Sequence, residues 1–287
     1  MLGQSQTSAD WSYVRMNGAG NAFIVVDGSK RKFQPSETEV RRLASPEAGL
    51  GGFDQLISIE RAHDADAFMR VWNADGSMVE TCGNALRCVG WLLLNRAGKD
   101  EVSIDTLGGI ARASRAGELQ VRVDMGEPRL NWDQIPLSEE MDTRGIELQV
   151  GPIDNPVMHT PGAVSMGNPH VVFFTDRQDD VFVRGTGSLI EHHPLFPEGV
   201  NVGFANVLDR NTIRLRVWER GAGLTLACGT GACGAMVAAS RRGLIDRSAT
   251  MILDGGELLV EWDEGSNHVF MTGPIEIETT GTLNSVL

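Results

Sequence analysis

The feature that most constrains the fold of this chain is an internal repeat. Cys82-Gly83 and Cys228-Gly229 each open an apolar run, and the two cysteines lie 146 positions apart. Further pairs keep nearly the same offset, namely Val71-Trp72 with Val217-Trp218, Gln55 with Asn201, and Gly20-Asn21 with Gly167-Asn168. Because self-similarity at a fixed spacing marks duplicated structural units, the sequence predicts two divergent copies of one domain.

Hydrophobic periodicity places many short strands and few helices in each copy. Residues 102–106 and 119–124 alternate apolar and polar side chains, as half-buried strands do. The apolar runs after Cys82 and Cys228 predict one long helix per half, with a shorter helix over residues 37–44. We therefore expect an α+β fold of two pseudosymmetric domains, each a mixed or antiparallel sheet wrapped round a central helix.

Charge and hydropathy argue against two classes of partner. The 287 residues include 25 Lys and Arg against 38 Asp and Glu, a formal net charge of −13. Nucleic-acid binding needs a basic face, which this balance does not favour. No apolar run approaches the roughly 18 residues that span a bilayer, and residues 1–10 lack the regions of a secretory signal. We therefore expect a cytoplasmic protein that binds neither nucleic acid nor membrane.

Cysteine and lysine usage argues against a metal or an organic cofactor. Cys82 with Cys88, and Cys228 with Cys233, have C-x5-C and C-x4-C spacings, unlike the C-x2-C pairs of zinc sites. The three lysines all lie in polar segments, so none is a persuasive Schiff-base residue for pyridoxal phosphate. The glycines after Cys228 lack the Gly-Lys-Ser/Thr of a phosphate loop. The sequence predicts no metal and no cofactor, with the cysteines kept as thiols.

Each Cys-Gly pair places a thiol at the positive end of a predicted helix. That field lowers a cysteine pKa from about 8.5 into the range of roughly 3.5–7.5. If the halves pack about a pseudo-twofold axis, Cys82 and Cys228 face each other across one cleft, where two helix ends offer N–H groups to one carboxylate. One thiolate can then remove a proton from a carbon while the other thiol delivers one to its opposite face. The pattern indicates inversion of a stereocentre by two bases.

Four motifs resemble those of the diaminopimelate epimerases. They are Arg15-Met16-Asn17-Gly18-Ala19-Gly20-Asn21, the stretch from Asn73-Ala74-Asp75-Gly76 to Cys82-Gly83-Asn84, Met166-Gly167-Asn168-Pro169-His170, and the stretch from Glu219-Arg220-Gly221 to Cys228-Gly229-Thr230. The resemblance implies a homodimeric, cofactor-independent isomerase that interconverts LL- and meso-diaminopimelate for lysine and peptidoglycan precursors. It also implies that the last strand returns to the first domain. With a proline-interrupted boundary at residues 126–136, we expect domains at 1–128 with 274–287 and at 129–273.

The resemblance assigns a role to each matching residue. Cys82 and Cys228 are the acid/base pair, and His170 and Glu219 tune the thiols. The reacting carboxylate is held by Gly83, Asn84, Gly229 and Thr230. The rest of an amino-acid substrate is held by Asn21, Gln55, Asn73, Asn168, Asn201, Glu219 and Arg220. The repeat independently pairs Gln55 with Asn201, Asn73 with Glu219, and Asn21 with Asn168.

Some positions depart from the family pattern or carry no catalytic role. The departures are Asn17 for His, Ala22 for Asp, Ala85 for Gly and Leu224 for Glu, and none of them removes a thiol. Cys88 and Cys233 are expected to be helix-core thiols, Arg87 an anchor of its helix, and His63 a solvated loop residue.

Two alternative functions remain open from the sequence. A racemase of another amino acid could use the same scaffold, as in the related proline racemases, but Arg220 and the asparagines fit a substrate with a second charged end better than an apolar ring. A binding protein could hold a carboxylate between two helix ends without chemistry. It would not need cysteine there, because serine caps a helix at least as well.

Overall fold

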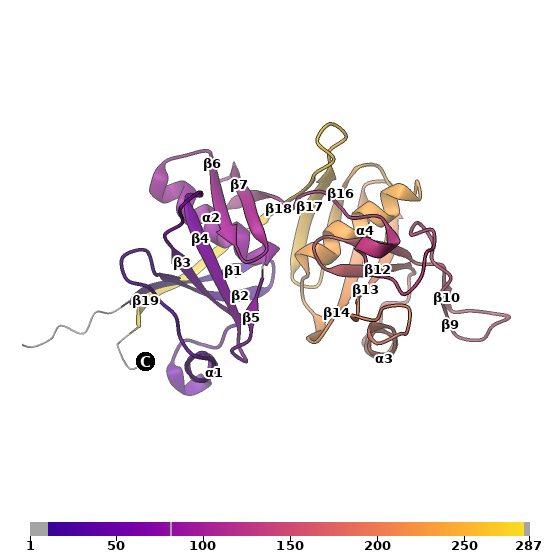
Figure 1. Cartoon of the computed structure of the whole chain (residues 1–287), viewed down its shortest axis with the longest axis horizontal. Coiled ribbons are helices and arrows are strands. Elements are labelled where there is room, and N and C mark those ends of the chain that lie inside the picture. The colour runs from indigo at the N-terminus through magenta and orange to yellow at the C-terminus, as the bar shows by residue number, and fades with distance from the viewer. Residues whose placement is uncertain (1–10, 81, 284–287) are drawn as a thin grey trace, which may run out of the picture. The chain divides into compact units, whose positions relative to one another are not determined.

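The computed structural model describes residues 11–80 and 82–283, which form two compact units (Figure 1). The first unit contains the chain up to Val121 and the segment from Ile275 onward, and the second contains Arg122–Pro274. The sequence places the boundary after residue 128, whereas the compact units divide between Val121 and Arg122, and the Met125 N–H already donates to the Val269 carbonyl of the second unit. Residues 1–10, whose role as a secretory signal we considered above, lie outside the described residues.

The first unit is built mostly of strands. Its elements are β1 (Trp11–Gly18), β2 (Asn21–Asp27), α1 (Glu37–Ala44), the 3₁₀ turn η1 (Pro46–Ala48), β3 (Gln55–Glu60), β4 (Ala67–Asn73), β5 (Met78–Val79), α2 (Gly83–Ala97), β6 (Glu101–Thr106), β7 (Gly109–Gly117) and β19 (Glu276–Leu283). β8 (Gln120–Asp124) leads from this unit into the second. The predicted helix over 37–44 is confirmed as α1, which Ser36 and Glu39 cap reciprocally.

The second unit repeats this order and adds a small hairpin. Its elements are η2 (Trp132–Gln134), β9 (Gln149–Val150), β10 (Met158–His159), β11 (Gly162–Ser165), β12 (Pro169–Phe174), α3 (Asp180–Glu191), β13 (Asn201–Asp209), β14 (Thr212–Glu219), β15 (Gly223–Thr225), α4 (Gly229–Arg241), β16 (Ser248–Leu253), β17 (Gly256–Trp262) and β18 (Val269–Pro274). β9 and β10 pair only with each other among the described strands.

Strand pairing confirms the internal repeat. β2 is parallel to β3, β3 antiparallel to β4, and β4 parallel to β6; β12, β13, β14 and β16 pair in the same directions and order. The register matches as well, since Leu56 lies opposite Trp72 and Val202 opposite Trp218. A slip of one residue would turn the apolar face of a strand outward. Because the register is shared, side chains related by the repeat point to the same face of the sheet in both units.

The helices that follow the two Cys-Gly pairs are the predicted central helices. Most of α2 is buried, and it contacts β1, β6 and β7; α4 is buried along nearly its whole length and contacts strands from β11 to β18. A helix that is buried on most of its sides is one that other elements cover, here the strands of its own unit. Gly98, in the left-handed conformation at φ 61°, ends α2 where the sequence predicts.

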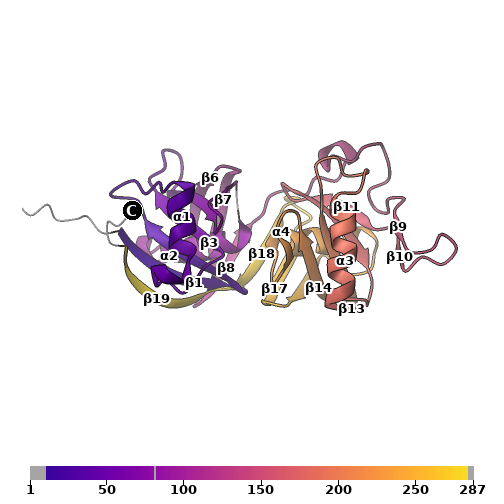
Figure 2. The same ribbon diagram turned by 90° about the horizontal axis from the view of Figure 1, so that it is seen from below.

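The prediction of one long helix per half is wrong for the second unit. α3 extends over 12 residues and packs on β13 and β14 (Figure 2). Its Gly185, Gly187 and two valines have low helix propensity, which hides the helix from a local pattern. Packing requires one of these glycines, because a Cβ on Gly187 would lie 2.5 Å from the Trp218 side chain.

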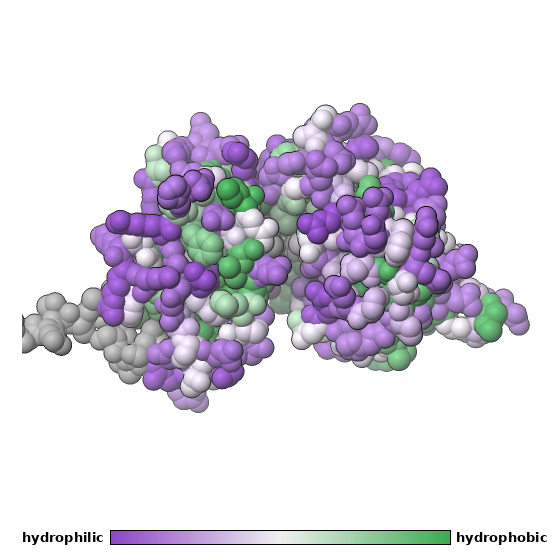
Figure 3. Space-filling view, viewed as in Figure 1, coloured by the Kyte–Doolittle hydropathy of each residue, from purple (hydrophilic) through white to green (hydrophobic). Residues whose placement is uncertain are grey.

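The C-terminal strand closes the first unit. β19 runs antiparallel to β1 from Trp11 opposite Leu283 to Asn17 opposite Glu276, with a bulge at Arg15. β1 also pairs with β2, so the last strand joins the sheet on the other side of β1. Polar side chains cover most of the visible face of each unit (Figure 3). No helix in the described part of the chain is long and apolar enough to cross a membrane.

Candidate active site

Cys82 and Cys228 occupy the same position in their units, the residue that precedes the first turn of the central helix. Their backbones are nearly identical, at φ −141° and ψ 113° for Cys82 and φ −129° and ψ 107° for Cys228. Each carbonyl accepts the first helical hydrogen bond at 2.9 Å, from Leu86 and Ala232 respectively. Neither first turn carries an acidic side chain, so no carboxylate of the helix itself neutralises its positive end.

The Cys228 sulfur caps its own helix. Sγ accepts a hydrogen bond of 3.4 Å from the Gly231 N–H and lies 3.6 Å from the Thr230 hydroxyl. A Cβ on Gly231 would come within 3.0 Å of Val217 and 3.2 Å of the sulfur, so glycine allows this close approach. The thiol also hydrogen-bonds to the Glu219 carboxylate.

The surroundings of Cys228 contradict the predicted lowering of its pKa. The side chain is buried, and burial together with the nearby Glu219 carboxylate raises the pKa of the thiol well above its usual value. Hydrogen bonds from Thr230 and Gly231 act in the opposite direction but are outweighed. The desolvation penalty on the thiolate is therefore larger than the stabilisation that the helix end provides. As a result, this thiol is protonated at neutral pH.

Glu219 is held at the end of β14, next to Cys228. The Thr225 hydroxyl on β15 donates a hydrogen bond to its carboxylate, which is half-buried in the structure. Burial raises the pKa of Glu219, and the hydrogen bonds from Thr225 and Cys228 offset only part of that effect. A carboxyl group and a thiol that share one hydrogen bond influence each other's protonation directly.

His170 is a neutral, fixed side chain. It is 1% exposed, and burial followed by the Arg220 charge lowers its pKa to about 3. Its Nε2 lies 3.0 Å from Oδ1 of Asn168, which indicates that the proton of the neutral ring is on Nε2. α4 approaches it closely, since a Cβ on Gly234 would lie 3.3 Å from the histidine Cβ. The structure therefore places His170 beneath α4 with Asn168 beside it.

Asn201 and Arg220 meet where β13 begins and β14 ends. Asn201 is buried; its amide donates to the Pro169 carbonyl at 2.8 Å, and its Oδ1 accepts from the Arg220 N–H at 2.9 Å. The Arg220 guanidinium is exposed and donates to the Glu198 carbonyl at 2.7 Å. Within the described residues, Nη1 makes this bond, and a guanidinium has five donors, so others can bind a ligand.

The first unit brings its predicted residues together in two clusters. In one, the Asn84 amide donates to Oδ1 of Asn21 at 2.6 Å, and the buried Arg87 donates to Oδ1 of Asn84 at 2.8 Å. In the other, the Gln55 amide donates to Oδ1 of Asn73 at 3.1 Å. Oδ1 and Nδ2 of these amides are assigned from the network they form.

The acceptor oxygen of Gln55 is the open end of the second cluster. Oε1 is buried and has no hydrogen-bond partner within the described residues. A buried acceptor in that state costs free energy, on the order of 1–3 kcal/mol, unless a ligand or water supplies a donor. The side chain is therefore suited to accept a hydrogen bond from an ammonium group.

Four residues have the structural or solvated placements that the sequence predicts. Cys88 and Cys233 are buried within α2 and α4, and burial raises the pKa of Cys88 to about 12. Arg87 is fully buried and bonded to its own helix. His63 is almost fully exposed beside Asp64. These predictions are confirmed.

The departures from the family pattern have structural roles of their own. Asn17 accepts a hydrogen bond of 2.8 Å from the Gly20 N–H, and the Ala22 N–H donates to the Asp54 carboxylate at 2.8 Å. Ala85 is buried in α2, and Leu224 packs against the core of the second unit. Asp54 thus places a carboxylate beside Ala22.

Three residues near the candidate site escape the sequence analysis. Asp54 accepts from Asn21 at 3.5 Å, Thr225 donates to Glu219, and Glu191 accepts from the Gly221 N–H at 2.8 Å. Thr225 and Glu191 belong to no recognisable motif, and Glu191 ends a helix that the sequence pattern misses. A search for polar residues at positions next to the repeated motifs could have found Asp54, which precedes Gln55.

Known proteins match this chain closely in sequence. A family model described as Diaminopimelate epimerase matches residues 13–131 and 162–278. The chain is similar to a protein named Diaminopimelate epimerase from Caulobacter sp. (strain K31), with 56% identity over 95% of this chain and 97% of the relative. A protein of the same name from Phenylobacterium zucineum (strain HLK1) is 55% identical over 94% of this chain and 97% of its own length.

Solved structures show the same fold at low sequence identity. A hydroxyproline epimerase from Agrobacterium vitis has a TM-score of 0.65 and 16% identity, covering 97% of this chain and 92% of that protein. A protein of the phenazine biosynthesis PhzF family from Enterococcus faecalis has a TM-score of 0.63 and 14% identity, covering 96% of this chain and 99% of that one. These similarities concern the two-unit scaffold.

Proposed function

Because this chain belongs to the diaminopimelate epimerase family, we propose that it interconverts LL- and meso-diaminopimelate without a cofactor. The observation that carries the proposal is the matched placement of Cys82 and Cys228 before their central helices. A structural thiol would not need to recur at the same backbone position in both units. Acid and base on opposite faces of one carbon require one thiol from each.

The reaction moves one proton off the α-carbon and another onto it. The thiolate of one cysteine takes the α-proton and becomes a thiol, while the C–H bonding pair stays on the substrate. The other thiol then protonates the opposite face and becomes a thiolate. Atoms and charge balance, and the two cysteines have exchanged roles. Proton exchange with solvent then returns the new thiol to thiolate and the new thiolate to thiol, which regenerates the starting enzyme after a net turnover.

The helix ends stabilise the carbanion. We assign the reacting carboxylate to the first-turn N–H groups of Gly83, Asn84, Gly229 and Thr230. Negative charge spreads onto this carboxylate as the α-proton leaves, so donors that are already in place bind the transition state more tightly than the substrate. The first turns carry no acidic side chain that would oppose this charge.

The remaining polar residues suit the rest of the substrate. The buried Gln55 oxygen can accept from an ammonium group, and the exposed Arg220 guanidinium can pair with the distal carboxylate. The other members of this substrate-binding set are Asn21, Asn73, Asn168, Asn201 and Glu219. Glu219 and burial keep Cys228 protonated, which suits Cys228 to act as the acid when Cys82 is the base.

Single cysteine variants test the two roles. Cys82→Ser and Cys228→Ser should each abolish epimerisation, because a serine hydroxyl is too weak an acid to supply a comparable anion near neutral pH. Each variant should still eliminate HX from a β-halogenated analogue whose α-proton faces the remaining thiol. Equal processing of both configurations by both variants would show that the thiols do not serve opposite faces. Cys88→Ser is the matched control, because it replaces a buried thiol within α2, the helix that follows Cys82.

A substrate panel separates this proposal from racemisation of another amino acid. Deuterium from solvent should enter the α-position of LL- and meso-diaminopimelate and not that of proline or of simple amino acids. We further propose a cytoplasmic homodimer, on the basis of family membership. Sedimentation of the purified protein at a monomer mass would contradict the dimer, and cell fractionation tests the location.

A further inference from the structure

A backbone hydrogen bond recurs behind both candidate catalytic cysteines. In the first unit the Gly108 N–H, in the turn between β6 and β7, donates to the Glu80 carbonyl at 3.1 Å. In the second the Gly255 N–H, in the turn between β16 and β17, donates to the Leu226 carbonyl at 2.8 Å. Both acceptors stand two residues before a cysteine, so each hairpin turn holds the segment that leads into a helix start.

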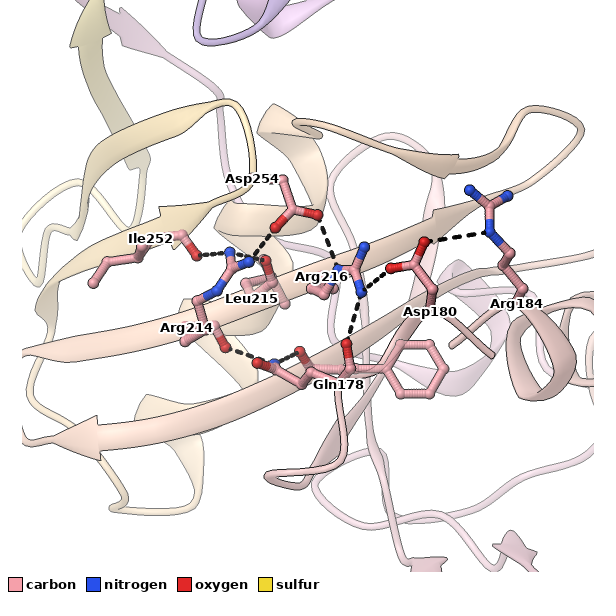
Figure 4. A network of polar contacts seen from close by, with 9 residues as sticks. Gln178, Asp180, Arg184, Arg214, Leu215, Arg216, Ile252 and Asp254 are labelled. Atoms are coloured by element: carbon pink, nitrogen blue, oxygen red, sulfur yellow. Dashed lines mark hydrogen bonds and ion pairs between the residues drawn. The ribbon is translucent and has the colours of Figure 1, made fainter. Parts of the chain in front are cut away.

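In the second unit this turn is also held by ion pairs. The Asp254 carboxylate accepts hydrogen bonds from Arg214 and from Nε of Arg216, the latter at 2.9 Å (Figure 4). The side chain of Arg216 is only 12% exposed and also donates to the Gln178 carbonyl and pairs with Asp180, each at 2.7 Å. Charge-assisted bonds that are partly shielded from water hold their partners more firmly than exposed pairs.

The first unit lacks the equivalent anchor. Leu107 stands at the position that matches Asp254, so its turn carries no carboxylate there. Arg70, which matches Arg216, pairs instead with Glu60 on the neighbouring strand, at 2.9 Å. The duplicated backbone bond is therefore reinforced by ion pairs in the second unit. The first unit has no matching carboxylate at this turn.

Asp254 connects two supports of the Cys228 thiol. Arg214 and Arg216 lie on β14, the strand that ends at Glu219, and Glu219 hydrogen-bonds to Cys228. Gly255, the next residue after Asp254, holds Leu226, two residues before Cys228. A single carboxylate thus ties the strand that carries Glu219 to the segment that carries the thiol.

We propose that Asp254 is a positioning residue that keeps Cys228 buried and within reach of Glu219 and the Gly231 N–H. Its carboxylate bonds to Arg214 and Arg216 rather than to the thiol, and it acts through the Gly255–Leu226 bond. The catalytic meaning of this role rests on the proposed function, since it matters for turnover only if Cys228 is an acid/base group. The structural part of the proposal can be measured on the thiol itself.

The test is alkylation of each cysteine by iodoacetamide, followed by peptide mass spectrometry across a range of pH. In Asp254→Asn the Cys228 segment loosens and its thiol becomes better solvated. Its alkylation at a fixed pH should therefore rise roughly threefold to tenfold, equivalent to a fall in pKa of about half a unit to one unit. The Cys82 profile should stay unchanged. Asp254→Glu keeps the charge and should restore most of the wild-type profile.

Glu60→Gln is the matched control, because it removes the ion pair of Arg70 at the equivalent place in the first unit. This variant should leave the alkylation profiles of both Cys82 and Cys228 unchanged. With diaminopimelate, Asp254→Asn should lower kcat more than it changes KM, since a displaced acid affects the proton transfer and not the initial binding. If Asp254→Asn does not fold, Arg216→Lys weakens the same anchor and should give the same shift in smaller measure.

Two results would overturn the proposal. One is an Asp254→Asn protein, folded by circular dichroism, whose Cys228 alkylation matches the wild type. The other is an equal change at Cys82 and Cys228, which would indicate general loosening. If the proposed function itself is wrong, Cys228→Ser keeps epimerase activity. That result is independent of the effect of Asp254→Asn on alkylation.

Discussion

The side-chain amide of Asn84 donates a hydrogen bond of 2.6 Å to Oδ1 of Asn21, which joins the first turn of α2 to the first residue of β2. Arg87 in turn donates to Oδ1 of Asn84. The two asparagines thus hold each other at the helix start that we assign to the reacting carboxylate. Neither side chain is free to reorient without breaking a bond to the other.

This relationship predicts strong coupling between the two asparagines. Asn84→Ala and Asn21→Ala should each lower kcat/KM, by about 1–3 kcal/mol of transition-state binding, because each leaves a polar group without its partner. The double variant should lose clearly less than the sum, since one bond is lost in all three. Asn95→Ala, near the other end of α2, should leave kcat/KM unchanged. Additive losses in the double-mutant cycle would argue against a shared role.

Glu219 should control the pH at which Cys228 ionises. Its carboxylate and its hydrogen bond both raise the pKa of the thiol, so Glu219→Gln should lower that pKa. The alkylation profile of Cys228 should then move toward lower pH. Glu257→Gln makes the same charge change on an exposed part of β17 and should not move it. A shift toward higher pH would contradict the electrostatic assignment of Glu219.

Arg220 should discriminate for a substrate with a distal carboxylate. Arg220→Ala leaves that charge unpaired and should lower kcat/KM for diaminopimelate by about 2–5 kcal/mol. Arg210→Ala removes an exposed guanidinium that pairs with Asp246, and should have little effect. Steady-state kinetics of both variants provide the comparison. Wild-type activity in Arg220→Ala would refute the assignment of the distal carboxylate but not two-thiol chemistry.

Glu191 should stabilise the turn that carries Glu219 and Arg220. Its carboxylate accepts from Trp218 Nε1 at 2.7 Å and from the Gly221 N–H at 2.8 Å. Glu191→Ala should lower the free energy of unfolding by about 1.5–3 kcal/mol, as expected for lost bonds to a charged group. Urea unfolding at pH 7 measures this loss, and Glu198→Ala, whose side chain is exposed, is the control.

The same carboxylate predicts a pH dependence of stability. Burial acts to raise the pKa of Glu191, but the hydrogen bonds from Trp218 and Gly221 outweigh it, so the pKa is lower in the folded protein. The stabilisation is therefore complete above the unfolded-state pKa, near 4.5, and is lost as pH falls through the folded value. The difference in stability between wild type and Glu191→Ala should narrow in acid. A difference that grows as pH falls would refute this assignment.

Sequence reasoning was most successful where the repeat supplied two observations of one feature. The offset between Cys82 and Cys228 predicted the two central helices. The same offset pairs Gln55 with Asn201, and the structure confirms the match because each is the first residue of its strand. Local periodicity added α1, whose capping residues Ser36 and Glu39 lie three positions apart in sequence. Such features depend on neighbouring residues or on a duplicated pattern, and both can be read from the chain.

Features that depend on tertiary packing could not be read in that way. α3 contains Gly187, a glycine that the proximity of Trp218 explains. The raised pKa of Cys228 follows from burial and from Glu219, so the helix end alone gave the wrong direction. Thr225 enters the site because β15 folds back on β14. Each of these required the three-dimensional arrangement.

The return of β19 to β1 has a consequence for the order in which this protein can fold during synthesis. The ribosome makes β1 before the second unit and β19 after it, so the first unit lacks its closing strand until the second unit has been synthesised. The second unit is continuous in sequence and can complete its sheet earlier. Pairing strands so distant along the chain also incurs the largest loop-closure entropy in the molecule. Until β19 pairs with it, the nascent first unit therefore exposes one edge of β1. Among the described strands this edge waits longest for its partner, and an unpaired edge can pair with other chains.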